Sequence, residues 1–432
     1  MPTSIQKPTA LPWPRWKPRA VRFTFVLVVL ATVHLLPLLT QYLYFQPVVR
    51  AVTATVRPGS FAVVDALIAI GALIIGGGDT AFVENPAPRY ATRAAVTATA
   101  YFVGFLLVSA VITGAWSLVD KRRTQYTSLD SRTRVYARYL LAAVVMLYAM
   151  AKVIPTQFGF LAPGALLRPL GQLSRFDMLW TFMSVSTGYT VFVGVVELLA
   201  ALLLFSPRTT LLGALLATGA LTNVIALDIA YDVRGPLIPA ILLFLLAVIV
   251  LLPYAQLLWR LVLPPLASDG PKAPSRRFRL PWGYALSAKA IVLAWLIGTL
   301  VQAGLQQRST YFGVGRPIYG LFDVEPLASG PATVNAGAND AGTWKLVGSA
   351  GSTNSNGLFV QFANGDVRQF RLEDDLLQRT WKLRQRTDEV ATLRYDLQSD
   401  GTVLLNGVIG SETVKMRLRP VEPTRYPLAG WR

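Results

Sequence analysis

Residues 139–152 read YLLAAVVMLYAMAK, and residues 191–205 read VFVGVVELLAALLLF. Both stretches are apolar enough to cross a membrane, yet Lys152 ends the first and Glu197 interrupts the second. A charge at the bilayer centre costs roughly 2.5–3.5 kcal/mol on insertion scales, so such residues usually have a partner, a function or both. These two side chains are therefore the first candidates for a functional site.

The composition is typical of a multi-pass helical membrane protein. Of 432 residues, 53% are hydrophobic and only 15% are charged, whereas a soluble domain has about a quarter charged. Apolar runs of about 20 residues also follow one another along the chain, as in helical membrane proteins. We identify these runs at 22–45, 60–76, 91–118, 138–154, 181–205, 209–229, 236–262 and 284–304.

The positive charge lies between the apolar runs. Residues 1–304 carry 26 Lys and Arg against 10 Asp and Glu, while residues 305–432 carry 15 against 13. A basic soluble domain would indicate nucleic-acid binding, but basic connections between spans indicate topology, because they stay in the cytoplasm. We therefore expect membrane lipids as partners and no nucleic acid. The most basic connections are 1–22, 119–138 and 260–279.

All three basic connections lie in the cytoplasm only if one of the first apolar runs does not cross. Run 60–76 is the weakest, because it contains Asp65 and ends in Gly76-Gly77-Gly78. We assign it as a re-entrant or interfacial segment on the outer side, where Asp65 lines a cavity or faces the outer water. About seven crossings of the cell (inner) membrane remain, with the N-terminus in the cytoplasm and the C-terminal part outside.

This assignment divides the chain into four parts. They are a disordered cytoplasmic tail at 1–21, an N-terminal membrane region at 22–118, a helical membrane core with a final span at 119–304, and an extracytoplasmic β-rich domain at 305–432. The fold class is thus an all-α membrane bundle with a small C-terminal antiparallel β domain.

The C-terminal part has short runs of alternating polar and apolar residues separated by turns. The pairs Asn364-Gly365, Asp400-Gly401 and Asn406-Gly407 are typical of hairpin turns. They predict a meander or small barrel of about six antiparallel strands. We expect a packing or interaction module rather than a catalytic domain, because this part contains no His and no Cys.

Depth in the membrane brings three polar residues into one layer. With a helical rise of 1.5 Å per residue, Lys152 lies about 21 Å from the inner boundary, Glu197 about 16 Å and Asn223 about 21 Å. A polar pocket in the outer half of the membrane is one interpretation. The other is a buried structural ion pair with an amide partner, and Lys152 alone can also extend to the outer interface.

Other polar residues fall at the predicted outer ends of the helices. These candidates for the mouth of the pocket are Asp79, Gln157, Tyr189, Tyr231 and Asp232. Turn formation explains Asp79 equally well, and Tyr231-Asp232 also fits a plain turn. We expect His34, which has Pro37 one turn later, to bond a freed backbone carbonyl rather than to bind a ligand. The sequence shows no metal-binding cluster, P-loop or nucleophile–base set.

Several of these residues belong to a longer pattern, which also includes Tyr148, Trp180-Thr181-Phe182-Met183, Arg208-Thr209 and Tyr231-Asp232-Val233. Over about residues 70–262 the chain resembles the DoxX-like (DoxX/DoxD) integral membrane proteins. Gly76-Gly77-Gly78-Asp79-Thr80 is similar to the Gly-Ser-Gly-Asp-Thr segment of the longer members, which carry an outer C-terminal domain. The resemblance implies recurrent polar positions at Lys152, Glu197, Asn223 and Asp232.

Two classes of function follow. A DoxD-type relative is the membrane subunit of a thiosulfate:quinone oxidoreductase, so the resemblance implies a quinone-linked subunit whose polar pocket binds a quinone headgroup. The absence of cysteine argues against sulfur chemistry on the polypeptide itself. The alternative is a non-enzymatic scaffold or transporter-like protein, whose outer β domain recruits a soluble or membrane-bound protein partner. The sequence leaves open whether the protein is an enzyme.

Overall fold

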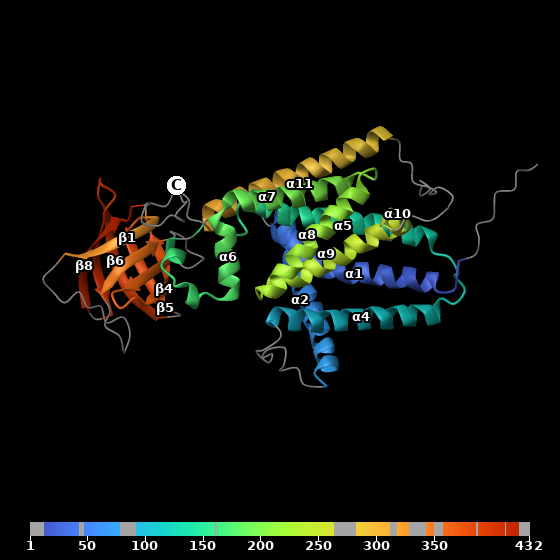
Figure 1. Ribbon diagram of the computed structural model, residues 1–432, viewed down its shortest axis with the longest axis horizontal. Coiled ribbons are helices and arrows are strands. Elements are labelled where there is room, and N and C mark those ends of the chain that lie inside the picture. The colour runs from blue at the N-terminus through green and yellow to red at the C-terminus, as the bar shows by residue number, and fades with distance from the viewer. Residues whose placement is uncertain are drawn as a thin grey trace, which may run out of the picture. The chain divides into compact units, whose positions relative to one another are not determined.

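The computed structural model describes residues 13–42, 47–77, 92–159, 161, 163–262, 282–311, 318–327, 343–349, 357–385, 388–410 and 412–422. The chain forms two compact units, whose helices and strands appear in Figure 1. The first unit contains residues 1–150 and 194–300, and the second contains residues 151–193 and 301–432.

The first unit is helical. Its helices are α1 (Lys17–Tyr42), α2 (Pro47–Ile75), α4 (Arg93–Val119), most of α5 (Thr127–Val153), much of α7 (Thr187–Phe205), α8 (Thr210–Ala230), α9 (Arg234–Leu251), α10 (Ala255–Val262) and much of α11 (Trp282–Tyr311). A short 3-10 turn, η3 (Leu252–Tyr254), joins α9 to α10.

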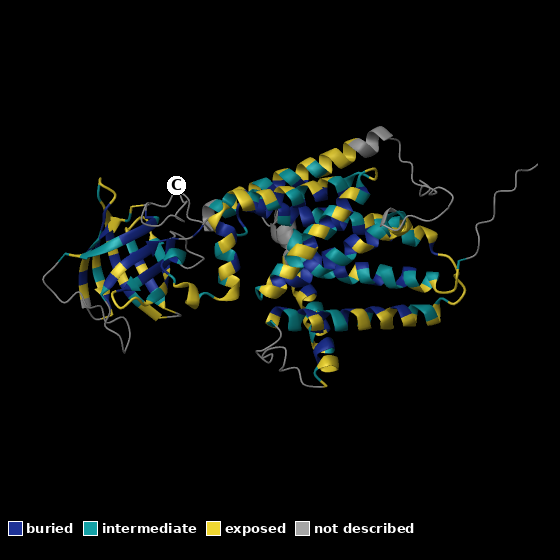
Figure 2. Ribbon diagram, viewed as in Figure 1, coloured by how far each residue is buried: buried dark blue, intermediate teal, exposed yellow. Residues whose placement is uncertain are grey.

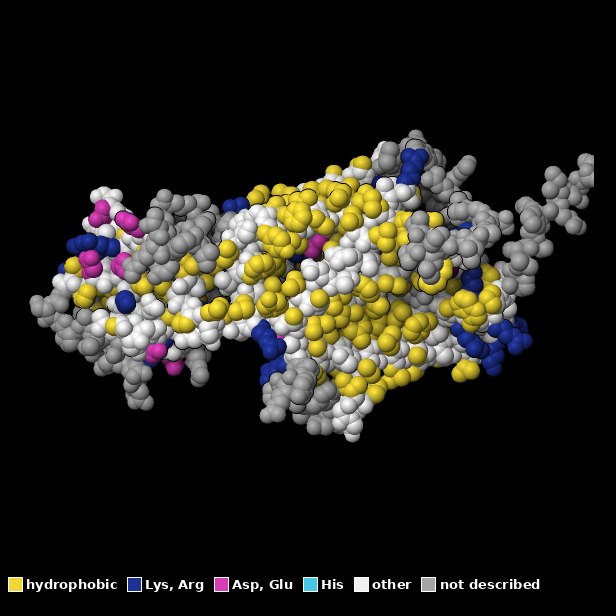
Figure 3. Space-filling view, in the orientation of Figure 1, with side chains coloured by type: hydrophobic (Ala, Val, Ile, Leu, Met, Phe, Trp, Pro, Cys, Tyr) yellow, Lys and Arg dark blue, Asp and Glu magenta, His cyan; other side chains and the backbone are white. Residues whose placement is uncertain are grey.

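The helices have the length and composition of membrane spans. In the described part of the chain, eight segments are long and apolar enough to cross, at 17–39, 54–75, 93–119, 127–153, 187–205, 210–230, 234–260 and 287–308. Large apolar side chains on these helices are also exposed, including Val111 (62%), Phe192 (62%) and Ile291 (68%), and Figure 3 shows broad apolar areas. The predicted multi-pass helical architecture is confirmed at this level.

Segment 60–76, which the sequence predicts to be a re-entrant or interfacial segment, is part of a longer helix. It belongs to α2, one continuous helix of 29 residues that ends just before the glycine run, where Gly77 has φ +61°. In Figure 1, α2 runs steeply across α1 and α4 instead of alongside them. The sequence underestimated this helix because Pro58 and Asp65 reduce the hydropathy of a stretch that still forms helix.

Close contact between α2 and α4 depends on two glycines. A Cβ on Gly71 would lie 1.7 Å from the carbonyl oxygen of Ala100, and one on Gly104 would lie 2.0 Å from that of Leu67. Small residues of this kind let two membrane helices approach backbone to backbone. These two positions therefore fix where α2 crosses α4.

The second unit contains a closed β-barrel. Its strands are β1 (Gly320–Pro326), β2 (Trp344–Ser349), β3 (Leu358–Phe362), β4 (Val367–Asp375), β5 (Thr380–Gln385), β6 (Asp388–Leu397), β7 (Val403–Ile409) and β8 (Glu412–Pro420). Each strand pairs with the next in antiparallel fashion, and β1 pairs with β8. The predicted antiparallel β domain is confirmed, but eight strands replace the six expected. Closure leaves no free sheet edge.

Two of the three predicted hairpin turns are confirmed. Gly365 (φ +91°) turns β3 into β4, and Gly401 (φ +82°) turns β6 into β7. The third prediction is wrong, because Asn406 and Gly407 lie inside β7, and the chain turns at Gly410 instead. A Cβ on Gly407 would lie 2.1 Å from the carbonyl oxygen of Thr392, so this glycine serves close strand contact rather than a turn.

Apolar side chains fill the barrel. Burial alternates along the strands, as Figure 2 shows, with Trp381, Leu383 and Leu393 among the fully buried residues. Outside the barrel, a turn after α5, η1 (Pro163–Leu166), packs against β2 and β3. A Cβ on Gly164 would lie 1.9 Å from the ring of Phe359. Residues 151–193, which also include η2 (Leu170–Gln172) and α6 (Arg175–Val185), thus belong with the barrel.

Candidate functional site

The two charges within apolar helices are both buried. Lys152 near the end of α5 and Glu197 in the middle of α7 are each 5% exposed, and neither is without an interaction partner. Their burial agrees with the requirement that intramembrane charges avoid lipid. Lys152 belongs to the second unit and Glu197 to the first, so the layer that would join them stays a prediction.

The third member of the predicted layer, Asn223, differs from the first two in its exposure. Asn223 is exposed on α8, whereas Asp228, five residues later on the same helix, is buried. Sequence reasoning missed Asp228, although it interrupts an apolar helix just as Glu197 does. The polar groups inside the described helices therefore include a second buried carboxyl group.

Asp232 acts as a cap for another helix. Its Oδ1 accepts a hydrogen bond from the backbone N–H of Ala94 at 2.7 Å, in the first turn of α4. The Thr92 hydroxyl accepts from Ala95 in the same turn, and Arg234 lies 3.7 Å from the carboxylate of Asp232. A carboxylate at a helix N-terminus satisfies free N–H groups and the helix dipole. This contact gives Asp232 a structural role.

The remaining residues predicted at the mouth of the pocket differ in their burial and contacts. Tyr231 is partly buried at the C-terminal cap of α8. Tyr189 is 44% exposed, and its ring lies 5.9 Å from that of Phe182. Gln157 donates its backbone N–H to Ala151, while its side-chain Oε1 is buried without a hydrogen-bond partner among the described residues. Asp79 lies outside the described residues, and Asp65 is exposed on α2.

His34 of α1, which is partly buried, packs against the buried Tyr101 of α4. Their ring centroids are 5.2 Å apart in an edge-to-face arrangement, and Tyr101 is fully buried beside Phe102 and Phe105. Neither Nδ1 of His34 nor the hydroxyl of Tyr101 has a hydrogen-bond partner within the described chain. The expected bond from His34 to a backbone carbonyl is therefore not made through Nδ1.

Buried polar groups without partners need an explanation. Burying an unpaired hydroxyl or imidazole nitrogen costs about 1–3 kcal/mol, so native proteins rarely leave them unpaired without a ligand, a water molecule or a function. Two such groups side by side within candidate spans provide a hydroxyl donor and an imidazole nitrogen. They suit a small molecule that accepts or donates hydrogen bonds in apolar surroundings.

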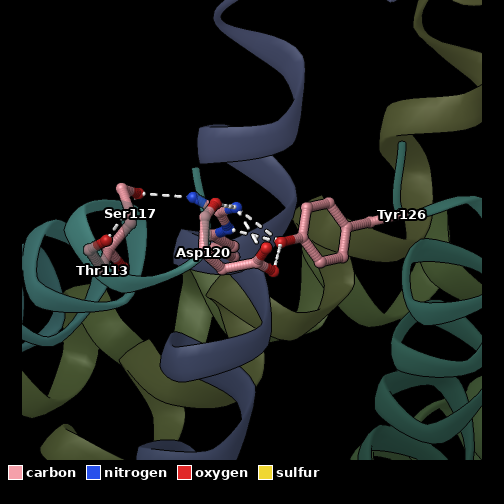
Figure 4. A network of polar contacts seen from close by, with 5 residues as sticks. Thr113, Ser117, Asp120 and Tyr126 are labelled. Carbon is pink, nitrogen blue, oxygen red and sulfur yellow. Dashed lines mark hydrogen bonds and ion pairs between the residues drawn. The ribbon is translucent and has the colours of Figure 1, made fainter. Parts of the chain in front are cut away.

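A second polar network joins three helices near their ends (Figure 4). Arg22 of α1 is 3% exposed and donates to the Tyr126 hydroxyl (3.0 Å), Ser117 Oγ (2.8 Å) and the Asp120 carbonyl oxygen (2.7 Å). The Tyr126 hydroxyl donates in turn to the Asp120 carboxylate. Arg22 also lies over the rings of Trp116 and Tyr126. We call these residues the Arg22 network.

The Arg22 network is electrostatically self-consistent. The hydrogen bond from Tyr126 holds the pKa of Asp120 below its ordinary value. Burial, followed by the bond to Asp120, raises the pKa of Tyr126. The lowered pKa of Asp120 and the raised pKa of Tyr126 thus keep the carboxylate charged and the phenol neutral near neutral pH. Sequence reasoning treated Arg22 only as part of a basic connection, and its position at the start of an apolar helix gave no sign of burial.

Among the described residues, no group of three or more His, Cys, Asp or Glu side chains is placed to hold a metal ion.

Comparisons with known proteins add little about function. No protein-family model matches the chain, and no solved structure matches it. A stretch of 96 residues, 22% of the chain, is 34% identical to "Uncharacterized protein YwoB" of Bacillus subtilis (strain 168). The chain spans 60% of the length of that relative. The name of this relative indicates no activity.

Proposed function

We propose that this chain is a DoxX-like membrane protein that binds a quinone or a similar amphipathic molecule within its helices, as the membrane subunit of an oxidoreductase. The observation that carries the proposal is a pair of buried polar atoms, Nδ1 of His34 and the hydroxyl of Tyr101, that have no hydrogen-bond partner among the described residues. A small-molecule site needs an apolar lining and a few placed polar groups. A quinone headgroup supplies two carbonyl oxygens that accept hydrogen bonds.

The buried charges support a second part of the proposal. Glu197, which is 5% exposed and belongs to the same unit as His34 and Tyr101, is our first candidate for exchanging protons with the headgroup, because intramembrane ionisable residues usually mark such routes. Lys152, which is also 5% exposed, is the second candidate. The exposure of Asn223 weakens its part in this pocket. Asp228, which is buried, is a better candidate on the same helix.

The proposed topology keeps the N-terminus in the cytoplasm and the barrel outside the inner membrane. It requires α2 to lie at the outer interface or to re-enter, so that seven helices cross. The steep angle between α2 and α4 in Figure 1 supports this assignment. A crossing by α2, whose length allows it, would place the barrel in the cytoplasm. A reporter fused after Arg432 distinguishes the two, because only the first predicts activity outside.

The barrel supports the alternative function, a scaffold that recruits a protein partner. Its interior is filled with apolar side chains, and its surface carries ion pairs such as Arg419–Glu325 at 3.1 Å and Arg384–Glu373 at 3.4 Å. These are features of a stable module that presents its outer face. In this alternative, the helices only anchor the barrel, and no quinone binds.

The lipid extract of the purified full-length protein tests the proposal. A quinone retained in about stoichiometric amount through purification supports the oxidoreductase subunit. An extract that contains phospholipid but no quinone, from membranes rich in quinone, would favour the scaffold.

A further inference from the structure

Five exposed cations occupy one end of the helical unit. Arg15 lies just before α1 and Arg19 lies in its first turn, and Lys121, Arg122 and Arg123 lie in the connection from α4 to α5. All five are exposed. Figure 3 shows Lys and Arg side chains gathered at the end of the bundle where α4 ends. We call these five residues the basic face.

The Arg22 network holds the two segments of the basic face together. Arg22, one turn after Arg19, bonds to Ser117 at the end of α4 and to the carbonyl oxygen of Asp120. The guanidinium groups of Arg22 and Arg123 both lie over the Tyr126 ring, at 4.8 Å and 5.1 Å from its centroid. Cations from distant parts of the sequence are therefore fixed side by side.

Carboxylates on these segments already have partners. Residues 1–45 contain no Asp or Glu, and residues 93–138 contain only Asp120 and Asp130. Asp130 binds Arg134 at 2.9 Å. Asp120 binds Tyr126 and lies 3.7 Å from Arg22. The basic face therefore presents an excess of positive charge.

Exposed apolar side chains lie among these cations. Trp16 is 66% exposed, Leu118 is 70% exposed and Val119 is 87% exposed. Aromatic and basic residues combined at the ends of apolar helices are typical of the membrane–water interface. A surface that only bound RNA would gain nothing from exposed Leu118 and Val119 beside its cations.

We propose that the basic face binds the headgroups of anionic phospholipids, with Trp16, Leu118 and Val119 inserted at the level of the acyl chains. Clusters of four to eight Lys and Arg next to a membrane helix have this property, with each cation contributing to the attraction. The Arg22 network makes the site a fixed one, because it sets the separation between its two segments. The proposal is independent of any quinone site, since it concerns other residues.

Native mass spectrometry of the full-length protein tests this proposal. The purified protein is mixed with equal amounts of phosphatidylglycerol and phosphatidylcholine, and the lipids that stay bound are counted. We expect a preference for phosphatidylglycerol that falls roughly a hundredfold in the Lys121→Gln/Arg122→Gln/Arg123→Gln variant. The matched control is Lys345→Gln/Arg371→Gln/Lys382→Gln, which removes three exposed charges from the barrel and should keep the preference.

Two further binding experiments distinguish a lipid headgroup from free phosphate and from RNA as the ligand of the basic face. Inorganic phosphate, compared with chloride at equal ionic strength, should not displace the lipid, and an RNA oligonucleotide should not bind. Displacement by phosphate, RNA binding that the basic-face variant abolishes, or an equal loss in both triple variants would overturn the proposal. If Arg123→Gln disturbs Tyr126, the variant Arg15→Gln/Arg19→Gln/Lys121→Gln, which spares that ring, must still lose the preference.

Discussion

Arg22 on α1 donates its Nε–H to the hydroxyl of Tyr126, 104 residues later, at 3.0 Å. Because Arg22 is almost fully buried and makes several charge-assisted hydrogen bonds, Arg22→Gln should destabilise the helical unit by on the order of 3 kcal/mol. Arg19→Gln removes an exposed charge one turn earlier and should change stability by less than about 0.5 kcal/mol. Thermal unfolding of both variants in detergent measures the difference, and similar midpoints would contradict a structural role for the network.

The same network predicts a dependence on pH. The pKa of Asp120 is lowered, so its contribution is fully present above its ordinary pKa of about 3.9 and is lost as the pH falls through the lower folded value. The pKa of Tyr126 is raised, so its contribution is present below about pH 10 and is lost as the pH rises through the higher folded value. The difference in melting temperature between wild type and Tyr126→Phe should therefore be constant near neutral pH. A difference that grows at either extreme would contradict this account.

The crossing of α2 and α4 depends on the absence of side chains at two positions. Gly104→Ala would place a Cβ 2.0 Å from a backbone oxygen of α2, so the helices must separate, at a cost of about 1–3 kcal/mol or more. Gly114→Ala on the same helix meets no atom within 4 Å and serves as the control. We expect a lower melting temperature for the first variant alone. Equal melting temperatures would mean that α2 does not pack on α4 in the membrane.

Removal of the Asp232 cap on α4 should lower the stability of the folded protein modestly. Asp232→Ala leaves the N–H of Ala94 without its acceptor and should cost about 0.5–2 kcal/mol. Asp232→Asn keeps an acceptor and tolerates the positive φ of 56° at this position, so it should cost less. If both variants also lose bound quinone while they stay folded, the structural interpretation of Asp232 is wrong.

Single and double variants of Lys152 and Glu197 distinguish a ligand-binding role from a structural role for these buried charges. If they serve a ligand, Lys152→Ala and Glu197→Gln should each lower quinone content while the protein stays folded. If they form a structural pair, both single variants should destabilise, and Lys152→Met combined with Glu197→Leu should restore stability, since a hydrophobic pair often replaces a buried ion pair without loss. Such a restoration without any change in quinone content would remove these residues from the proposed function.

Hydropathy and alternation were enough to predict the helical and β-rich parts, because both depend on local sequence. They predicted about six strands rather than the eight that close the barrel, because closure depends on the pairing of β1 (Gly320–Pro326) with β8, almost a hundred residues later. The hairpin turn predicted at Asn406-Gly407 was wrong for a related reason. Its glycine is required by close contact with Thr392 on a neighbouring strand. The local propensity of a short stretch of sequence does not predict such long-range contacts.

The candidate site was less predictable than the fold. Lys152 and Glu197 stood out because charge is rare in apolar runs, and both are buried. The partners of Arg22 and the contact between His34 and Tyr101 depend on which helices adjoin, which the sequence does not state. Asp228 carried the same signal as Glu197, but its place near the end of α8 made it resemble a loop charge.

Quinone content of purified Tyr101→Phe and His34→Phe variants tests the central claim most directly. Tyr101→Phe removes only the hydroxyl, and His34→Phe replaces the imidazole with a somewhat larger apolar ring. Tyr136→Phe, at a tyrosine 48% exposed on α5, is the matched control. We predict that wild type and Tyr136→Phe retain bound quinone in equal amounts. The quinone content of each of the other two variants should fall at least tenfold, while their melting temperatures stay unchanged. Equal quinone content in all four proteins, or none in any, would contradict a quinone site at His34 and Tyr101.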